Sequence, residues 1–333
     1  MKKIISVCLI AAILMILAAC GDATATPIAV TPTQIQVQTT IPATTLIPTT
    51  LPIVSTITPT PIPATSPVFS SEFSPKAFKR VFLIILENTD YSEAIRQTYL
   101  GQLAGKGALL KNYFAVTHPS YPNYLALVGG STFGVTSDGQ TDLDKSNLAD
   151  LMDAAGISWK VYAEGLPTTP CYKGVLSGDY ARKHEPFVSF LNVQNNPNRC
   201  ANIVPASRLQ SDITANSLAH YILYVPDQKN DGHDTGPKYT STWLQGFLPP
   251  MLNNPQVSQG TLFVVTFDEG LAGSSNQVYT VLAGDMVKAG SSSDKRYTHY
   301  DLLRTIEDNF QLGNLGREDA TATPISGIWN IAR

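Results

Sequence analysis

Apolar runs of strand length alternate with longer amphipathic runs over residues 76–333. Residues 80–86 (RVFLIIL) and 261–267 (TLFVVTF) are continuous apolar runs, the pattern of parallel strands buried on both faces. Further strands are expected at residues 108–116, 157–163, 220–225 and 278–283. Helices are expected at residues 92–103, 121–128, 147–155, 239–252 and 299–310. This alternation predicts an α/β fold with a mostly parallel central sheet sandwiched by helices.

The N-terminal part of the chain has a different pattern. Residues 1–20 place Lys2 and Lys3 before an apolar run, which is typical of a secretion signal. Residues 17–20 (LAAC) match a bacterial lipoprotein box, in which Cys20 becomes the lipidated first residue after cleavage. An ordinary cleaved signal or a short membrane anchor is the alternative. We therefore expect an extracytoplasmic lipoprotein that is held at the membrane by its N-terminal lipid.

Residues 21–75 are rich in Thr and Pro and carry almost no charge. Repeated Pro removes backbone donors and favours extended conformers, so a disordered stalk is expected here. Residues 76–333 are long enough for one large domain with its own core. The formal net charge of −3 does not suggest a nucleic-acid partner. No apolar run after the signal is long enough to span a bilayer.

The four cysteines have different expected fates. Cys8 would leave with the signal, and Cys20 would carry the lipid. Cys171 and Cys200 remain, within or beside a stretch at residues 164–206 that has the Pro and Asn content of an irregular excursion. In an oxidising compartment these two cysteines are expected to form a disulfide, with two buried free thiols as the alternative.

Polar side chains follow the predicted strands directly. Glu87 and Asn88 come after the first apolar run, and Asp268 and Glu269 come after residues 261–267. Because ligands of open α/β sheets bind beyond the carboxyl ends of the strands, these side chains are expected to share one rim. The same rim would receive further oxygen and imidazole groups from Ser120, Asp227, Asp231, His233, Asp234 and His299.

Carboxylates gathered at one rim repel one another and raise each other's pKa unless a cation neutralises them. The imidazoles of His233 and His299 would suit zinc, iron or manganese better than calcium. A divalent metal site is therefore predicted. The alternative for any single carboxylate is a helix cap or a solvated loop end.

Ser120 lies between Pro119 and Pro122, directly before an expected helix. A nearby cation lowers the pKa of a hydroxyl group, and a helix N-terminus offers backbone N–H groups to an incoming anion. Ser120 is thus a candidate nucleophile. A simple helix cap is the alternative.

Five motifs, in order along the chain, resemble those of the bacterial phosphoesterase family of acid phosphatases and phospholipases C, within the alkaline phosphatase-like superfamily. They are LENTDYS (86–92), THPSYPNYLALVGGSTFGV (117–135), NDGHD (230–234), TFDEG (266–270) and HYDLLRTIEDNF (299–310). The resemblance covers about residues 80–312 and implies an alkaline phosphatase-like fold. It also implies a small-molecule phosphoester as the substrate and one or two divalent metal ions as cofactors.

The resemblance further assigns a role to each matching residue. Glu87 and Asn88 match one metal-binding pair, and Asp268 and Glu269 match a second pair. Ser120 matches the nucleophile that contacts the metal and forms a covalent phospho-enzyme.

The remaining matches leave the number of ions open. His233 and His299, with Asp231 beside them, match positions that hold a second ion, contact phosphate or protonate the leaving group. Asp227 lies six residues before His233, whereas the phosphodiesterase pattern has a spacing of four. His118, in the nucleophile motif, could orient the serine, and His184, in RKHEPF, could reach the pocket or serve a structural role.

These features together predict a metal-dependent phosphoester hydrolase of the acid phosphatase type that acts through a phosphoserine. A phospholipase C or phosphodiesterase on the same fold is the close alternative, although phospholipases of this family are often longer. A non-catalytic surface lipoprotein that only binds a ligand is the alternative of another class, because a signal, a lipid and a stalk suit it equally well.

Overall fold

The computed structural model describes residues 76–169 and 171–330. The expected signal, the lipidation site Cys20 and the expected stalk at residues 21–75 lie outside this part of the chain. Within it, no helix combines the length and the apolar character needed to cross a membrane.

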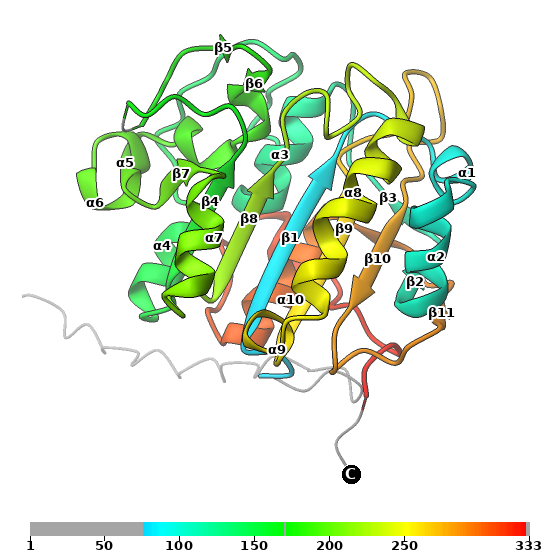
Figure 1. Ribbon diagram of the computed structural model, residues 1–333. Coiled ribbons are helices and arrows are strands. Elements are labelled where there is room, and N and C mark those ends of the chain that lie inside the picture. The colour runs from blue at the N-terminus through cyan, green and yellow to red at the C-terminus, as the bar shows by residue number, and fades with distance from the viewer. Residues whose placement is uncertain (1–75, 170, 331–333) are drawn as a thin grey trace, which may run out of the picture. The chain divides into compact units, whose positions relative to one another are not determined.

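A sheet of eight strands forms the centre of the domain (Figure 1). In spatial order its strands are β11 (Ser291–Ser293), β2 (Ala108–Leu110), β10 (Thr280–Ala283), β9 (Thr261–Phe267), β1 (Arg80–Leu86), β8 (Tyr221–Val225), β4 (Trp159–Ala163) and β7 (Ile203–Pro205). Only the two pairs made by β10 are antiparallel, and the other five neighbouring pairs are parallel. Two small ladders stand apart from the sheet and join β3 (Tyr113–Phe114) to β12 (Tyr297–Thr298) and β5 (Leu176–Ser177) to β6 (Tyr180–Ala181). The expected mostly parallel α/β architecture is confirmed.

Helices cover both faces of the sheet (Figure 1). The long helix α8 (Pro237–Leu252) packs against α2 (Thr98–Lys106) on one face, and α3 (Ser120–Gly129) packs against α10 (His299–Phe310) on the other. The shorter α-helices are α1 (Tyr91–Ala94), α4 (Leu148–Ala154), α5 (Leu191–Gln194), α6 (Pro197–Cys200), α7 (Arg208–Thr214), α9 (Pro255–Ser258) and α11 (Glu318–Thr321). Two 3₁₀ turns, η1 (Arg182–His184) and η2 (Pro186–Ser189), lie between β6 and α5.

The burial of the central strands β1 and β9 explains why their sequences are apolar without interruption. Every residue of β9 is buried, and so is every residue of β1 except Arg80. Since helices cover both faces, side chains that point to either face of these strands meet apolar neighbours. The bounds of both strands agree with the expected ones.

Two expected elements are each divided in the structure. The helix expected at residues 92–103 is the pair α1 and α2, because Gln97 adopts extended dihedral angles between them. The strand expected at residues 108–116 is divided because β3 leaves the main sheet and pairs with β12.

The excursion at residues 164–206 is more regular than expected. Its last residues form β7, the edge strand that pairs with β4, and a three-residue strand is too short to show a period in the sequence. The expected disulfide between Cys171 and Cys200 is present, with Cα atoms 5.0 Å apart.

Candidate metal and nucleophile site

Three adjacent strands end at the same edge of the sheet. Strand β1 lies between β8 and β9, so the residues that follow these three strands become neighbours. Backbone bonds continue past the strand ends: Glu87 N donates to Asp231 O (2.9 Å), and Asp268 N donates to Leu86 O (2.9 Å). These bonds hold Glu87 between the segments that carry Asp231 and Asp268.

Helix α3 begins with Ser120, and all ten of its residues are buried. The side chain of Asn123 holds the loop in front of it. Asn123 Oδ1 accepts from Val116 N (3.0 Å) and Thr117 N (3.1 Å), and its Nδ2 donates to Thr117 O (2.9 Å) and Pro119 O (3.1 Å). One amide group thereby fixes the backbone that leads into Ser120.

The hydroxyl of Ser120 is surrounded by acceptor oxygens. Ser120 Oγ lies 3.0 Å from Glu87 Oε2, 3.0 Å from Glu269 Oε1 and 3.2 Å from Asn88 Oδ1. A hydroxyl has one proton and can donate to only one of the three. The other contacts bring lone pairs together, which a cation among these oxygens would relieve.

Asn88 adopts a backbone conformation that places its amide at this point. Its φ of 46° lies in the left-handed region, which asparagine tolerates better than most residues. In this conformation Asn88 N donates to Asp268 Oδ1 (3.2 Å), while Asn88 Oδ1 faces Ser120 Oγ.

Asp268 is fully buried. Among the described residues its Oδ2 has no hydrogen-bond partner. Burial raises the pKa of Asp268 well above its usual range, and the charges of Glu87 and Glu269 raise it further. A buried, unpartnered carboxylate oxygen beside two other acids is the donor set of a divalent cation site, so the residues fit such an ion.

The second oxygen of Glu87 belongs to another cluster. Glu87 Oε1 accepts from Tyr124 OH (2.6 Å) and lies 3.1 Å from His184 Nε2. On the other side of the ring, His184 Nδ1 lies 3.1 Å from Asp231 Oδ2. Neither of these His184 contacts counts as a hydrogen bond, so both ring nitrogens and Asp231 Oδ2 lack a hydrogen-bond partner in the part of the chain that the structure describes.

Glu87, His184 and Asp231 therefore form a second candidate cation site, with ligand atoms within 4.8 Å of one another. Burial raises the pKa of Asp231 to about 8 and lowers the pKa of His184 to about 4. An imidazole that stays neutral at pH 7 is the form that binds a metal ion. Glu87 contributes one oxygen to each of the two clusters.

The expected histidines occupy different positions. His299 is fully buried, with Nε2 2.6 Å from Asp268 O and Nδ1 3.1 Å from Tyr113 OH, so it contacts the backbone of a candidate ligand. His233 is exposed, and its ring pairs with Asp234 (Nδ1 to Oδ1, 2.7 Å). Asp231, the partner expected for that ring, instead accepts from the backbone His233 N (2.8 Å).

His118 and Asp227 lie at the periphery of the site and have different contacts. His118 Nδ1 contacts Glu269 Oε2, which places this histidine one step from Ser120. Asp227 faces inward to its own turn, where its Oδ1 accepts from Lys229 N and Asn230 N. Asp227, which lies outside the phosphodiesterase spacing, therefore stabilises a turn.

His184 contacts both Glu87 and Asp231, although its sequence surroundings point to no such role. It lies on the 3₁₀ turn η1, far along the chain from every strand end of the site. The only signal is its place in RKHEPF, where Glu185 caps the next turn through Phe187 N and Val188 N. That local pattern does not indicate contact with Glu87.

Comparisons with known proteins support the resemblance. The model of the Phosphoesterase family matches residues 89–313. A probable acid phosphatase from Kluyveromyces lactis is 39% identical over 273 residues, which cover 78% of this chain and 65% of the relative. A phosphatidylinositol-3-phosphatase from Mycobacterium tuberculosis is 33% identical over 260 residues, which cover 76% of this chain and 83% of the relative.

The fungal acid phosphatases are the longer proteins, and the chain spans between 60% and 65% of their lengths. Because these relatives are fungal, the restriction of the resemblance to a bacterial family is not supported. A solved structure of a protein in the alkaline phosphatase superfamily from Vibrio parahaemolyticus aligns with a TM-score of 0.53 at 12% identity, covering 77% of this chain and 72% of that chain. This likeness concerns the fold.

Proposed function

The chain belongs to the Phosphoesterase family, and from this premise we propose that it hydrolyses small phosphomonoesters through attack by Ser120 on phosphorus. One observation carries the proposal. The Ser120 hydroxyl stands at the N-terminus of a buried helix with oxygens of Glu87, Glu269 and Asn88 within 3.2 Å. A merely structural helix cap has no need of two carboxylates at its hydroxyl.

The proposed reaction has two steps, attack by Ser120 and hydrolysis of the phosphoserine. Glu87 Oε2 or Glu269 Oε1, each 3.0 Å from Ser120 Oγ, accepts the hydroxyl proton as Oγ bonds to phosphorus. The bond between phosphorus and the ester oxygen breaks, and the departing alcohol takes a proton from a nearby histidine or from water. His233 is a candidate donor because it is exposed and its ring centroid lies 6.0 Å from that of His184. Water then attacks the phosphoserine, which releases phosphate and restores the hydroxyl.

The N-terminus of α3 contributes to the same step. The dipole of the helix favours the negative charge of a phosphoryl group at this end. Pro122 has no backbone N–H and Tyr121 N donates to Asp138 Oδ1 (3.0 Å), so the Ser120 N–H is the donor that this turn can offer to a phosphoryl oxygen. Asn123 keeps this turn and the preceding loop in place. Correct placement of a nucleophile accounts for a large part of the rate of such reactions.

The carboxylates are suited to hold the cofactor. Glu87, Asn88, Asp268 and Glu269 would hold one divalent cation beside Ser120, and Glu87, His184 and Asp231 would hold a second. When bound, such an ion supplies positive charge that lowers the pKa of a serine hydroxyl and offsets charge on the phosphoryl oxygens.

Hydrolysis of 4-nitrophenyl phosphate by the purified protein tests the proposal. Activity should disappear on chelation and return with a divalent metal. Ser120→Ala should lower kcat by at least roughly 10³, because it removes the attacking oxygen. Ser211→Ala, on the exposed surface of α7, is the matched control and should leave kcat unchanged. Full activity of Ser120→Ala would remove Ser120 from this role.

A lipid substrate is the second candidate. The Mycobacterium tuberculosis relative is a phosphatidylinositol-3-phosphatase, and this chain covers more of that relative than of the fungal enzymes. Phosphate release from a short-chain phosphatidylinositol 3-phosphate, compared with release from 4-nitrophenyl phosphate, separates the two substrates.

Cleavage of bis(4-nitrophenyl) phosphate as the better substrate would favour the phosphodiesterase or phospholipase C alternative. Absence of both turnover and bound metal would favour the binding lipoprotein.

We also propose that the protein acts outside the cytoplasm, anchored through Cys20. The disulfide between Cys171 and Cys200 supports an oxidising compartment. Metabolic labelling with a fatty acid tests the anchor, and Cys20→Ala should abolish the label and release the protein from membranes.

A further inference from the structure

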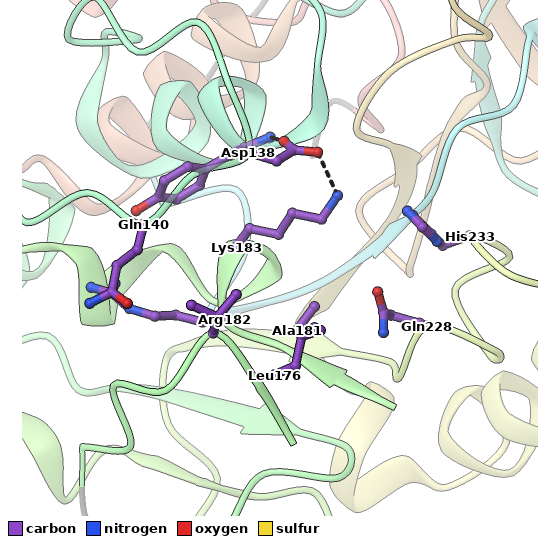
Figure 2. A pocket seen from close by; sticks show the side chains of 10 residues that line it. Asp138, Gln140, Leu176, Ala181, Arg182, Lys183, Gln228 and His233 are labelled. Carbon is purple, nitrogen blue, oxygen red and sulfur yellow. Dashed lines mark hydrogen bonds and ion pairs between the residues drawn. The ribbon is translucent and has the colours of Figure 1, made fainter. Parts of the chain in front are cut away.

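A pocket of about 250 Å³ adjoins the candidate site (Figure 2). Val175, Leu176 and Ala181 form its apolar wall, on and beside the β5–β6 hairpin. Lys183, Gln228 and His233 also line the pocket, and Figure 2 shows Lys183 and His233 facing each other across the space.

Two links along the chain connect the pocket to the proposed reaction centre. Tyr121, which lines the pocket, follows Ser120 directly and donates its backbone N–H to Asp138 Oδ1 (3.0 Å). Lys183 directly precedes His184, whose ring lies 3.1 Å from Glu87. A group bonded to phosphorus at Ser120 would therefore have this pocket beside it.

The two cationic side chains of the pocket each have a carboxylate partner. Lys183 Nζ lies 2.8 Å from Asp138 Oδ2, and Arg182 Nη2 lies 2.6 Å from Asp142 Oδ1. Arg182 Nε and Nη1 have no hydrogen-bond partner among the described residues. An anionic substituent that meets Lys183 would have to displace Asp138. The hydrogen bonds within the described residues leave the amide of Gln228 and His233 Nε2 available to a ligand.

The apolar wall is open to solvent. Val175 is 54% exposed and Leu176 is 57% exposed, and they are two of only four large hydrophobic residues with this degree of exposure among the described residues. Adjacent exposed apolar side chains that border a pocket are typical of a ligand-binding surface. A cavity of about 150 Å³ suffices to bind benzene, so a pocket of this size can hold one ring with a substituent.

We propose that this pocket binds the alcohol part of the substrate, and that it selects phosphomonoesters of a flat, largely apolar ring over those of small polyols. The inference rests on the proposed function and names its substrate class. Leu176 and Val175 cover one face of the ring, and Gln228 and His233 meet a polar substituent at its edge.

The test compares kcat/KM for phenyl phosphate and for glycerol 2-phosphate in the same purified protein. Leu176→Ser should lower kcat/KM for phenyl phosphate roughly 5- to 10-fold, mainly through KM, because it removes apolar contact with the ring. The value for glycerol 2-phosphate should change less than about twofold. Comparing each variant with the wild type cancels the difference in reactivity between the two esters.

Leu271→Ser is the matched control, since Leu271 is 50% exposed and does not line the pocket. It should leave the preference for phenyl phosphate unchanged. Equal losses on both substrates in Leu176→Ser, or no loss on either, would overturn the assignment while leaving the proposed function intact.

Binding without turnover separates this inference from the proposed function. By calorimetry, wild-type protein should bind phenylphosphonate more tightly than methylphosphonate, and Leu176→Ser should reduce that difference. If no phosphoester is hydrolysed and this difference persists, the pocket assignment stands and the proposed function fails. Equal affinity for the two phosphonates in the wild type would overturn the pocket assignment.

Discussion

At the scale of single residues, the environment decides what each ionisable group can do. Ser120 is an ordinary hydroxyl by composition, but two carboxylate oxygens lie 3.0 Å from its Oγ. Glu307, on α10, shows the effect of burial away from the site. Burial raises its pKa to about 9, and the nearby charge of Asp319 acts in the same direction.

Glu307 leads to a prediction about stability. Its ordinary pKa is 4.5 and its pKa in the folded protein is about 9, so the folded state keeps a proton that the unfolded state loses between these values. The free energy of unfolding should therefore fall as the pH rises from 4.5 towards 9, by up to about 1.4 kcal/mol per pH unit. Glu307→Gln should flatten this dependence in urea denaturation at pH 5, 7 and 9. Glu318→Gln, exposed on α11, should keep the wild-type slope, and equal slopes for all three proteins would contradict the prediction.

At the scale of elements, two local devices support the site. Asn123, in the first turn of α3, makes four hydrogen bonds to the loop at residues 116–119. The disulfide fastens the excursion that carries η1, and η1 supplies Lys183 and His184.

Replacing Asn123 with Ala should disturb both stability and rate. It leaves buried backbone groups without partners, so the free energy of unfolding should fall by about 3 kcal/mol. The loosened loop should also let Ser120 move by about 1 Å from its position, which should lower kcat by roughly 10². Asn198→Ala, exposed on α6, is the control for urea denaturation and for steady-state kinetics. Wild-type kcat in Asn123→Ala would show that the loop does not need this amide.

Removing the disulfide should loosen the excursion. The bond joins residues separated by 29 positions, so its loss in Cys171→Ser/Cys200→Ser should lower the free energy of unfolding by roughly 3 kcal/mol. Limited proteolysis should then cut the chain between residues 164 and 200 before it cuts the sheet. A cleavage pattern identical to that of the wild type would argue that the other contacts of the excursion suffice.

At the scale of the whole molecule, the order of the strands assembles the acids. Strands β9, β1 and β8 are neighbours, so Asp268, Glu87 and Asp231 come together although they are far apart along the chain. Gathering buried carboxylates costs free energy, and a bound divalent cation would offset that cost.

Metal removal should therefore lower the melting temperature as well as the activity. Adding back a divalent metal at 100 times its Kd should stabilise the wild-type fold by about 2.7 kcal/mol. Asp268→Asn should lose this metal-dependent shift, because it removes a charged ligand from the cluster. Asp294→Asn is the control, since the Asp294 side chain is 81% exposed and should leave the shift unchanged. An unchanged shift in Asp268→Asn would place the ion elsewhere.

Most of the fold could be predicted from the sequence, and the reasons are visible in particular elements. Strands β1 and β9 and helix α10 have the expected bounds, because long runs that are buried throughout or amphipathic throughout carry a clear pattern. Strands β7 and β11 were not expected. Each has three residues, and β11 consists of serines, so tertiary pairing rather than propensity makes them strands.

The sequence by itself determined which residues stand at the ends of buried strands, since an apolar run followed at once by Glu87 or Asp268 is visible without coordinates. Only the tertiary structure decided that His184 joins Glu87 and Asp231, and that Val175 and Leu176 line one pocket with Tyr121 and His233. The physical reason is the range of the interactions. An apolar run and the polar residue that ends it are neighbours in the chain. The contacts of His184, Val175 and Leu176 depend instead on how a long, disulfide-linked excursion returns to the edge of the sheet.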